Sequence, residues 1–159
     1  DGKGILSSHL HSEGKHAKEL ALEGPSTSRW VPEIIAENNP DDESYFPYMN
    51  GQFVFKHAVV RFSEAIVEGL EANGLQKEDI NMLIPHQANL RIAQFIQRKF
   101  QLNDDQVYNN IMNYGNTTAA SVIIALTEAW EKGKINEGDL VVLAAFGSGF
   151  TWGSVVIRW

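Results

Sequence analysis

The sequence predicts an α/β fold in which a mixed five-stranded sheet carries one helix buried at its centre. Three observations predict it. Short apolar runs typical of buried strands alternate with helical patterns, the last two strands are separated only by a tight turn, and one helical segment is small or apolar on every side. The resulting order, βαβαβαββ, contains three crossover connections, which favour a mostly parallel sheet with right-handed crossovers.

The first element is a predicted strand from Gly4 to His11, in which apolar and polar residues alternate loosely. Residues 12–48 follow as a long loop, with at most a short helix at 15–22, because Gly, Pro, Asn and acidic residues are frequent there. A loop of this length inside a compact domain is usually functional or packed against something else. Its aromatic residues, which favour packing, are Trp30, Tyr45, Phe46 and Tyr48.

A helix is predicted from about Phe53 to Asn73-Gly74, a pair typical of helix C-termini. The apolar residues that recur on one stripe of this helix are Phe55, Val59, Phe62, Ile66 and Leu70. The polar and charged residues that fall opposite are His57, Arg61, Glu64, Glu68 and Glu71. We therefore expect one face of the helix to be buried and the other to meet solvent.

A buried strand at Met82–Ile84 delivers a histidine to the turn that follows it. Pro85 ends the strand and His86 lies in the turn. Asn89 can cap the next helix, which runs to about Phe100. Open α/β sheets carry their chemistry at this end of the strands. Because the positive end of the helix dipole disfavours an imidazolium, we expect His86 to stay neutral and to donate a hydrogen bond.

The rest of the chain predicts a third strand at Val107–Ile111, a helix from about Thr117 to Glu131, and two final strands. Leu140–Phe146 is continuously apolar, so both of its faces should be covered, and Thr151–Trp159 should return as its antiparallel partner. The helix is small or apolar on every face for its first ten residues, which predicts burial on all sides. This chain offers no second sheet to cover it, so either a dimer or a missing half should.

The composition excludes several classes of function. The formal net charge of −7 argues against nucleic acid as a partner, and no apolar run reaches the roughly 18 residues that a membrane span needs. The chain has no cysteine, which removes disulfides, cysteine-ligated zinc and any thiolate nucleophile within it, and which is compatible with a cytoplasmic protein. It does not begin with Met and lacks a signal-peptide pattern, so we expect it to begin in mid-protein.

Two polar side chains, His86 and Asn116, are the candidates for chemistry. Taken alone, His86 is more often a turn histidine bonded to backbone, and Asn116 is more often the N-cap of the buried helix. Both follow a strand region and precede a helix, and such turns fall on one edge of a parallel sheet. Two neutral donors aimed at one point there would make an oxyanion hole. The turn at Phe146–Phe150 lies at the same edge, either as a plain hairpin or with a backbone N–H presented to an anion.

Two further groups of residues have a simple and a functional interpretation. Histidines could hold a metal ion. However, no carboxylate or third histidine lies at the spacing of a metal ligand from the two histidines on the first strand, so we predict no metal site. Those histidines are His9, His11, His16 and His57. A basic group is most simply a solvated helix face, but in a chain this acidic it could steer an acidic partner. Its members are Lys56, Arg91, Arg98 and Lys99.

Three motifs together resemble the β-ketoacyl-acyl-carrier-protein synthase III family, the condensing enzymes that start type II fatty-acid synthesis. The motifs are Pro85-His-Gln-Ala-Asn-Leu-Arg-Ile92, Tyr114-Gly-Asn-Thr117 with Ala119-Ala-Ser121, and Ala145-Phe-Gly-Ser-Gly-Phe-Thr-Trp-Gly-Ser154. Gly4–His11 and Met49–Lys56 also resemble the family. The resemblance covers essentially all of residues 1–159, but only the C-terminal half of that enzyme, and it identifies the chain as a condensing-enzyme domain.

The resemblance implies a thiolase-like half, because the thiolase fold joins two similar halves that each supply a sheet and a buried helix. It places the nucleophilic cysteine, which takes an acyl group from acyl-CoA, in the missing N-terminal half. It also implies that His86 and Asn116 hold the malonyl thioester carbonyl while CO2 leaves, and that the backbone N–H of Ser148 helps to hold a second oxyanion. The family further suggests a homodimer of whole enzymes in the cytoplasm.

The resemblance also implies how substrates bind. No permanently bound cofactor is expected, since coenzyme A thioesters and phosphopantetheine serve as substrate arms. The residues that match the lining of the pantetheine tunnel are Gly51, Phe55, Ala88, Asn89 and Phe146. Gln52 departs from the Asn that the family pattern leads us to expect. The residues that match the basic patch receiving acyl carrier protein are Lys56, Arg91, Arg98 and Lys99.

Two other functions stay open at this point. A condensing enzyme of secondary metabolism would use the same His and Asn with another acyl primer. An isolated, non-catalytic pairing or binding domain is favoured, for this polypeptide taken alone, by the absence of cysteine.

Overall fold

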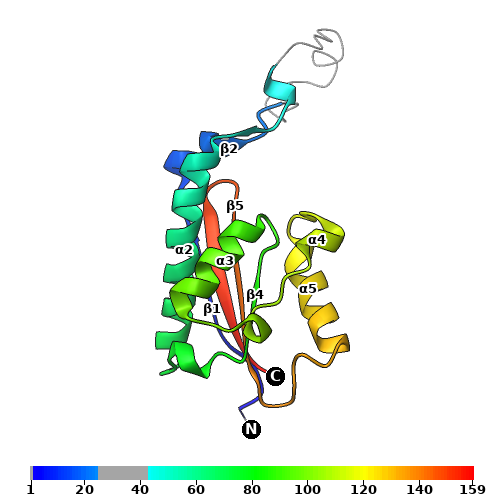
Figure 1. Ribbon diagram of the computed structural model, residues 1–159. Helices are drawn as coiled ribbons and strands as arrows, with labels where there is room; N and C mark the ends of the chain where they lie inside the picture. Colours follow the sequence, from blue (N-terminus) through cyan, green and yellow to red (C-terminus); the bar gives the residue numbers. More distant parts are fainter. Residues whose placement is uncertain (1, 25–42) are drawn as a thin grey trace.

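The computed structural model describes residues 2–24 and 43–159. Its centre is a four-stranded sheet in the order β1-β6-β5-β4, with helices on both faces (Figure 1). The strands are β1 (Gly4–Ser12), β4 (Met82–Pro85), β5 (Leu140–Gly147) and β6 (Thr151–Arg158). β4 and β5 pair in parallel, whereas β6 runs antiparallel to both β5 and β1. The sheet is therefore mixed, as predicted, but only one of its strand pairs is parallel.

Helices cover the sheet unequally. Figure 1 shows α2 (Gly51–Glu71) and α3 (Leu90–Phe100) on one face and α5 (Ala120–Glu131) on the other, with the short α4 (Ile111–Tyr114) beside α5. α2 lies across β1, β5 and β6, whereas α5 packs mainly on β4 and β5. Short 3-10 helices connect these elements: η1 (Gly14–Glu19), η2 (Glu43–Tyr45), η3 (Lys77–Asp79) and η4 (Asp104–Gln106).

Asparagine side chains start both long helices on the first face. The Asn50 side chain accepts a hydrogen bond from the backbone N–H of Phe53 at 3.3 Å, and the Asn89 side chain accepts one from Arg91 at 2.9 Å. Each satisfies a helix N–H that has no partner within its own helix. The predicted cap at Asn89 is thus confirmed, whereas α2 begins two residues earlier than the predicted Phe53.

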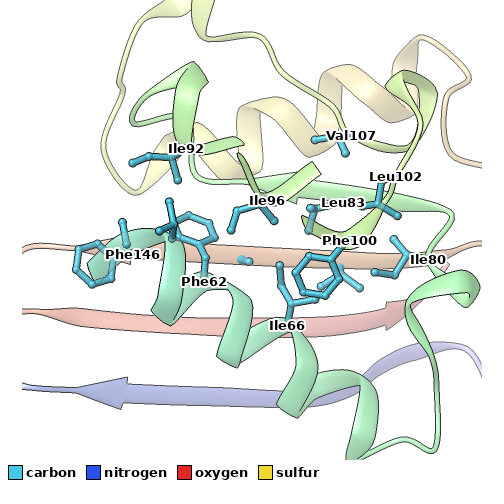
Figure 2. Packing of buried hydrophobic residues seen from close by; sticks show 14 of the residues in the cluster. Phe62, Ile66, Ile80, Leu83, Ile92, Ile96, Phe100, Leu102, Val107 and Phe146 are labelled. Atoms are coloured by element: carbon cyan, nitrogen blue, oxygen red, sulfur yellow. The ribbon is translucent and has the colours of Figure 1, made fainter. Parts of the chain in front are cut away.

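The core is divided by the alternation of side chains along the strands. Leu83 faces α2 and α3, and its neighbours Met82 and Ile84 face α5, because successive side chains of a strand point to opposite faces. All three are 1% exposed or less. Figure 2 shows the larger cluster, in which Phe62 and Ile66 of α2 meet side chains of α3 and the sheet. The predicted apolar stripe of α2 is the one that packs there.

The predicted strand at Val107–Ile111 is wrong. Val107 makes a single parallel bridge to Leu83 beside β4, and α4 already begins at Ile111. The physical reason is a competing side chain: Gln87 Oε1 accepts the backbone N–H groups of Asn110 and Ile111 at 3.0 and 3.1 Å. These N–H groups are therefore not available to a strand ladder, and in the described part of the chain the sheet has four strands rather than five.

The helix near 117–131, for which we predicted burial on all sides with a dimer or a missing half as part of its cover, is buried on one side within this chain. α5 begins at Ala120 and buries one face, along Ser121, Ala125 and Ala129, while Ile123 and Trp130 are 58% and 55% exposed. The reason is that only the sheet covers this helix. Its outward face keeps the apolar composition that led to the prediction.

The predicted loop at 12–48 holds short elements at its described ends. In place of a helix at 15–22, the chain forms η1 and then β2 (Leu20–Ala21), which pairs antiparallel with β3 (Tyr48–Met49). Figure 1 shows this small ribbon beyond one end of the main sheet. Trp30 and the rest of 25–42 lie outside the described residues. Within the part that is described, no helix is both long and apolar enough to cross a membrane.

Candidate active site

One large cavity, of about 1380 Å³, opens where β1, β4 and β5 end. The first turns of three helices border it, through Gly51 at the start of α2, Asn89 at the start of α3 and Ala119 at the start of α5. Helix N-termini carry a partial positive charge from their unpaired N–H groups. The three helix starts therefore favour negative charge in the cavity, and the sheet edge is the one predicted to carry chemistry.

His86 is held at the floor of this cavity by backbone and side-chain hydrogen bonds. Its backbone N–H donates to the carbonyl of Ala144 on β5 at 2.8 Å, which continues the β4–β5 pairing into the turn. Its ring Nδ1 lies 2.6 Å from the hydroxyl oxygen of Ser121. Burial lowers the pKa of the His86 imidazole. A neutral ring at neutral pH, as expected from the sequence, agrees with this direction.

Asn116 borders the same cavity from the turn before α5. The chain reaches it through Gly115, whose φ of 67° and ψ of −161° suit glycine. The Asn116 side-chain oxygen accepts the backbone N–H of Thr118 at 2.9 Å, and within the described residues its amide nitrogen has no partner. Asn116 is not the N-cap of the helix, which is Ala119. Its amide N–H groups are thus left for a ligand.

The segment between Asn116 and α5 also contains a strained residue. Thr118 has a φ of 52°, one of two positive φ values outside glycine in the described chain. A β-branched residue in this region is uncommon and costs about 1–3 kcal/mol. Strain of this kind concentrates at functional sites, because surrounding contacts must hold it in place.

The turn between β5 and β6 forms another wall of the cavity. Ser148 and Phe146 both border it, and Phe146 is 5% exposed and packs edge-on against Phe150 at 4.9 Å. The left-handed conformation of this turn falls on Gly149, with a φ of 108°, and not on Ser148. A serine at 148 is therefore compatible with the turn, and the residue borders the cavity.

The residues predicted for the pantetheine tunnel border this same cavity. Gly51 and Phe55 come from the first turns of α2, and Ala88 and Asn89 precede α3. Phe55 packs edge-on against Phe95 of α3 at a ring distance of 6.4 Å, which fixes one side of the opening. The structure thus brings together His86, Asn116, Ser148, Gly51, Phe55, Ala88, Asn89 and Phe146.

The predicted basic group is divided. Its four residues are exposed and form no ion pair within the described chain. Arg91 borders the large cavity, but Lys99 borders a shallow hollow on α2 together with Glu64, Glu68 and Glu71. These carboxylates offset the charge of Lys99. Arg91 is therefore the member of the group that is close to the site.

Of the other histidines, His11 also borders the large cavity, whereas His9, His16 and His57 do not. His9 and His11 both contact Glu68, at 3.3 and 2.6 Å. His16 and His57 pack against each other, with ring centroids 5.0 Å apart. Within residues 2–24 and 43–159, no group of three possible ligands is arranged for a metal ion.

Two residues at the site were not predicted from the sequence. Ser121 contacts His86, and Gln87 ties the turn after β4 to the start of α4 through Asn110. A signal was present for Ser121, which is a polar residue in an otherwise apolar helix start. Gln87 had no such signal, because a glutamine beside a turn is usually exposed, whereas here it is 3% exposed.

The arrangement as a whole suits the stabilisation of an oxygen anion. An imidazole and a carboxamide, both neutral, border one cavity with helix N-termini around it. Preorganised donors of this kind stabilise charge that develops during a reaction, because they need not reorient.

Comparisons with known proteins show which family the chain resembles. A family model described as 3-oxoacyl-[acyl-carrier-protein (ACP)] synthase III C terminal matches residues 70–159. The β-ketoacyl-[acyl-carrier-protein] synthases III of Rhodospirillum centenum and Caldanaerobacter subterraneus are 44% and 45% identical over 158 residues. The alignments cover 99% of this chain but 45% and 46% of those proteins. The chain thus spans about half the length of the curated relatives it matches.

Solved structures share the fold over the whole chain. The β-ketoacyl-[acyl carrier protein] synthase III of Thermus thermophilus superposes with a TM-score of 0.85 at 40% identity, covering 100% of this chain and 47% of that one. The 3-oxoacyl-[acyl-carrier-protein] synthase III of Aquifex aeolicus gives 0.84 at 35%, covering 100% and 46%. The priming β-ketosynthase of the R1128 polyketide pathway gives 0.79 at 26%, covering 98% and 45%.

Proposed function

Because this chain belongs to the family of 3-oxoacyl-[acyl-carrier-protein] synthase III C-terminal domains, we propose that it supplies the condensing half of such an enzyme. The observation that carries the proposal is the single cavity that both His86 and Asn116 border. The cavity also has room for a substrate arm, and the sheet edge on which it lies is the usual location of α/β active sites.

The proposed reaction is a decarboxylative condensation. The thioester carbonyl oxygen of a malonyl group accepts hydrogen bonds from His86 and Asn116. The carbon–carbon bond to the carboxylate breaks, CO2 leaves with its carbon, and the bonding electron pair forms an enolate whose negative oxygen stays on the two donors. Each donor of such a site typically lowers the barrier by about 3–4 kcal/mol.

The enolate carbon then attacks an acyl group held as a thioester on cysteine. The new carbon–carbon bond produces a tetrahedral oxyanion, for which the backbone N–H of Ser148 is the proposed donor. Collapse of this intermediate expels the cysteine thiolate and releases the 3-oxoacyl thioester. Since this chain contains no cysteine, we propose that a second half of similar length supplies the nucleophile. The exposed apolar face of α5, with Ile123 and Trp130, is the surface that this half would cover.

The proposed substrates are an acyl-CoA and a malonyl-acyl carrier protein. Gly51, Phe55, Ala88 and Asn89 would line the path of the phosphopantetheine arm, and no permanently bound cofactor enters the proposal. The exposed Arg91 at the cavity would attract the acidic carrier protein. Lys56, Arg98 and Lys99 would contribute less directly, and Lys99 least, because it borders a hollow that glutamates also line.

The fatty-acid reaction is favoured over the alternatives. The curated relatives that are 44% and 45% identical to this chain are both β-ketoacyl-[acyl-carrier-protein] synthases III. A non-catalytic pairing module would not require two neutral donors at one cavity. A homodimer of whole enzymes and a location in the cytoplasm stay predictions from the resemblance.

The experiment separates the two half-reactions in the full-length protein. His86→Ala or Asn116→Ala should lower condensation by about 100-fold or more, because each removes one oxyanion donor. Acyl transfer from acyl-CoA to cysteine, measured by the mass of the acylated protein, should stay close to wild type. Equal loss of both steps in both variants would contradict the proposed roles.

A further inference from the structure

The hydroxyl group of Ser121 occupies a buried position between two turns. Ser121 lies in the first turn of α5 and is 2% exposed. Its oxygen is 2.6 Å from His86 Nδ1 and 3.1 Å from the backbone nitrogen of Gln87. Within the described residues these are its two hydrogen-bond partners, so the direction of each bond can be worked out from donors and acceptors alone.

The pairing of buried donors with acceptors indicates which ring nitrogen of His86 carries the proton. The backbone N–H of Gln87 can only donate, so the Ser121 oxygen accepts from it. If the Ser121 oxygen also accepted from Nδ1–H, its own buried hydroxyl hydrogen would have no acceptor among the described residues. The arrangement that pairs every buried donor therefore has this hydrogen donated to His86 Nδ1. A nitrogen that accepts a hydrogen bond is unprotonated in the neutral ring, so the proton lies on Nε2.

The residues just before α5 also orient Asn116, the second proposed donor. The backbone N–H of Thr118 occupies the side-chain oxygen of Asn116 at 2.9 Å, and the Thr118 carbonyl accepts the backbone N–H of Ser121 at 3.1 Å. In both side chains the acceptor atom is therefore engaged by the protein. What each presents to the cavity is an N–H donor.

We propose that Ser121 is a positioning residue that holds His86 in the Nε2–H tautomer, so that the ring can only donate to an oxygen in the cavity. The proposal concerns the arrangement of the active site and rests on the proposed function for its catalytic consequence. In the other tautomer, Nε2 would present a lone pair to the substrate oxygen and would repel it.

The test is made on the full-length protein labelled with 15N at histidine, with the His86 signals assigned by comparison with a His86→Asn variant. In the wild type we expect Nδ1 to resonate as an unprotonated nitrogen and Nε2 as a protonated one. In Ser121→Ala we expect the two signals to move towards each other as both tautomers become populated. Condensation should fall about ten-fold through kcat, as the loss of one orienting hydrogen bond would give, while acyl transfer to cysteine is retained.

Two further variants separate positioning from packing. Ser121→Thr keeps the hydroxyl and should restore the wild-type tautomer and most of the condensation rate. Ser63→Ala is the matched control, because Ser63 is an equally buried helix serine whose hydroxyl bonds to the carbonyl of Val59, away from the cavity. It should leave the His86 signals and both half-reactions unchanged.

A protonated Nδ1 in the wild type would overturn the proposal, as would a wild-type tautomer and rate in Ser121→Ala. If Ser121→Ala does not fold, the wild-type spectrum and the Ser121→Thr variant still show whether His86 is held in the Nε2–H tautomer. A protein that shows the expected tautomer but forms no 3-oxoacyl product would contradict the proposed function and leave the assignment of Ser121 to the tautomer intact.

Discussion

At the scale of single residues, Glu13 shows how neighbouring charges shift a surface group. Its carboxylate pairs with Lys15 and lies 3.0 Å from the guanidinium of Arg61. Hydrogen bonds from Lys15 first, and then from Arg61, lower the pKa of Glu13 from 4.5 to about 2. Arg61 also stacks over Trp152 at 4.8 Å, so this pair connects η1, α2 and β6.

The lowered pKa predicts a contribution to stability that depends on pH. A carboxylate whose pKa is lower in the folded state stabilises the fold above its unfolded value, and the contribution is lost as pH falls towards the folded value. The free energy of unfolding should therefore decrease less steeply between pH 4.5 and about 2 in Glu13→Gln than in the wild type. Urea titrations at several pH values in this range measure the difference.

Glu71→Gln is the control for this prediction. Glu71 is an exposed carboxylate on α2 without an ion pair among the described residues. Its replacement should leave the pH dependence close to that of the wild type. If the two variants show the same slope, the Glu13 pair does not contribute in the way proposed.

At the scale of elements, the approach of α2 to β6 depends on Gly69. A Cβ placed on Gly69 would lie 2.8 Å from the buried side chain of Val156 and 3.0 Å from the hydroxyl of Ser154. That hydroxyl already donates to the carbonyl of Ala65 on the same helix at 2.6 Å. α2 is thus hydrogen-bonded to β6, and the two elements lie so close together that only glycine fits at position 69 without a shift.

Gly69→Ala should destabilise the protein even though alanine is the better helix former. The gain in helix propensity is about 1 kcal/mol, whereas overpacking of a close contact typically costs about 1–3 kcal/mol. We expect a net loss of about 1 kcal/mol in the free energy of unfolding, measured by chemical denaturation.

Gly51→Ala, in the first turn of the same helix, is the matched substitution. Among the described residues, an added Cβ there has no neighbour closer than the Met49 side chain at 3.9 Å. It should be neutral or slightly stabilising. A stabilising effect of Gly69→Ala equal to that of Gly51→Ala would show that the contact with β6 relaxes without cost.

At the scale of the whole molecule, charge is distributed so that an acidic chain presents a cation at its cavity. The net charge is −7, yet Arg91 borders the cavity without an ion pair among the described residues. If an acidic carrier protein docks there, Arg91→Glu should raise the apparent KM for malonyl-acyl carrier protein by about ten-fold or more. Placing like charges opposite each other across an interface typically costs several kcal/mol of binding free energy. The KM for acyl-CoA should change less.

Two further substitutions serve as controls for the Arg91→Glu experiment. Lys77→Glu makes the same charge change in η3, which follows the far end of α2 (Figure 1), and should not discriminate between the two substrates. Lys99→Glu should have a smaller effect than Arg91→Glu, because Lys99 borders the hollow that contains Glu64 and Glu68. An equal change in both KM values for Arg91→Glu would remove the docking surface from the proposal.

The sequence by itself determined the features that depend on local periodicity and on turn chemistry. The strands β1, β4, β5 and β6, the cap at Asn89 and the grouping of His86 with Asn116 at one sheet edge could all be predicted from it. Apolar alternation, helix caps and turn-forming Gly or Pro residues act over a few residues, and so they can be recognised in the sequence before the tertiary structure is known.

Only the tertiary structure decided what depends on distant partners. Val107 lacks a full strand because Gln87, far away in sequence, takes the N–H groups that a strand would use. α5 is small or apolar on every face over its first turns but is covered on one face, because this chain brings a single sheet to it. The tautomer of His86 depends on Ser121, since a hydrogen bond between two turns exists only once the chain has folded.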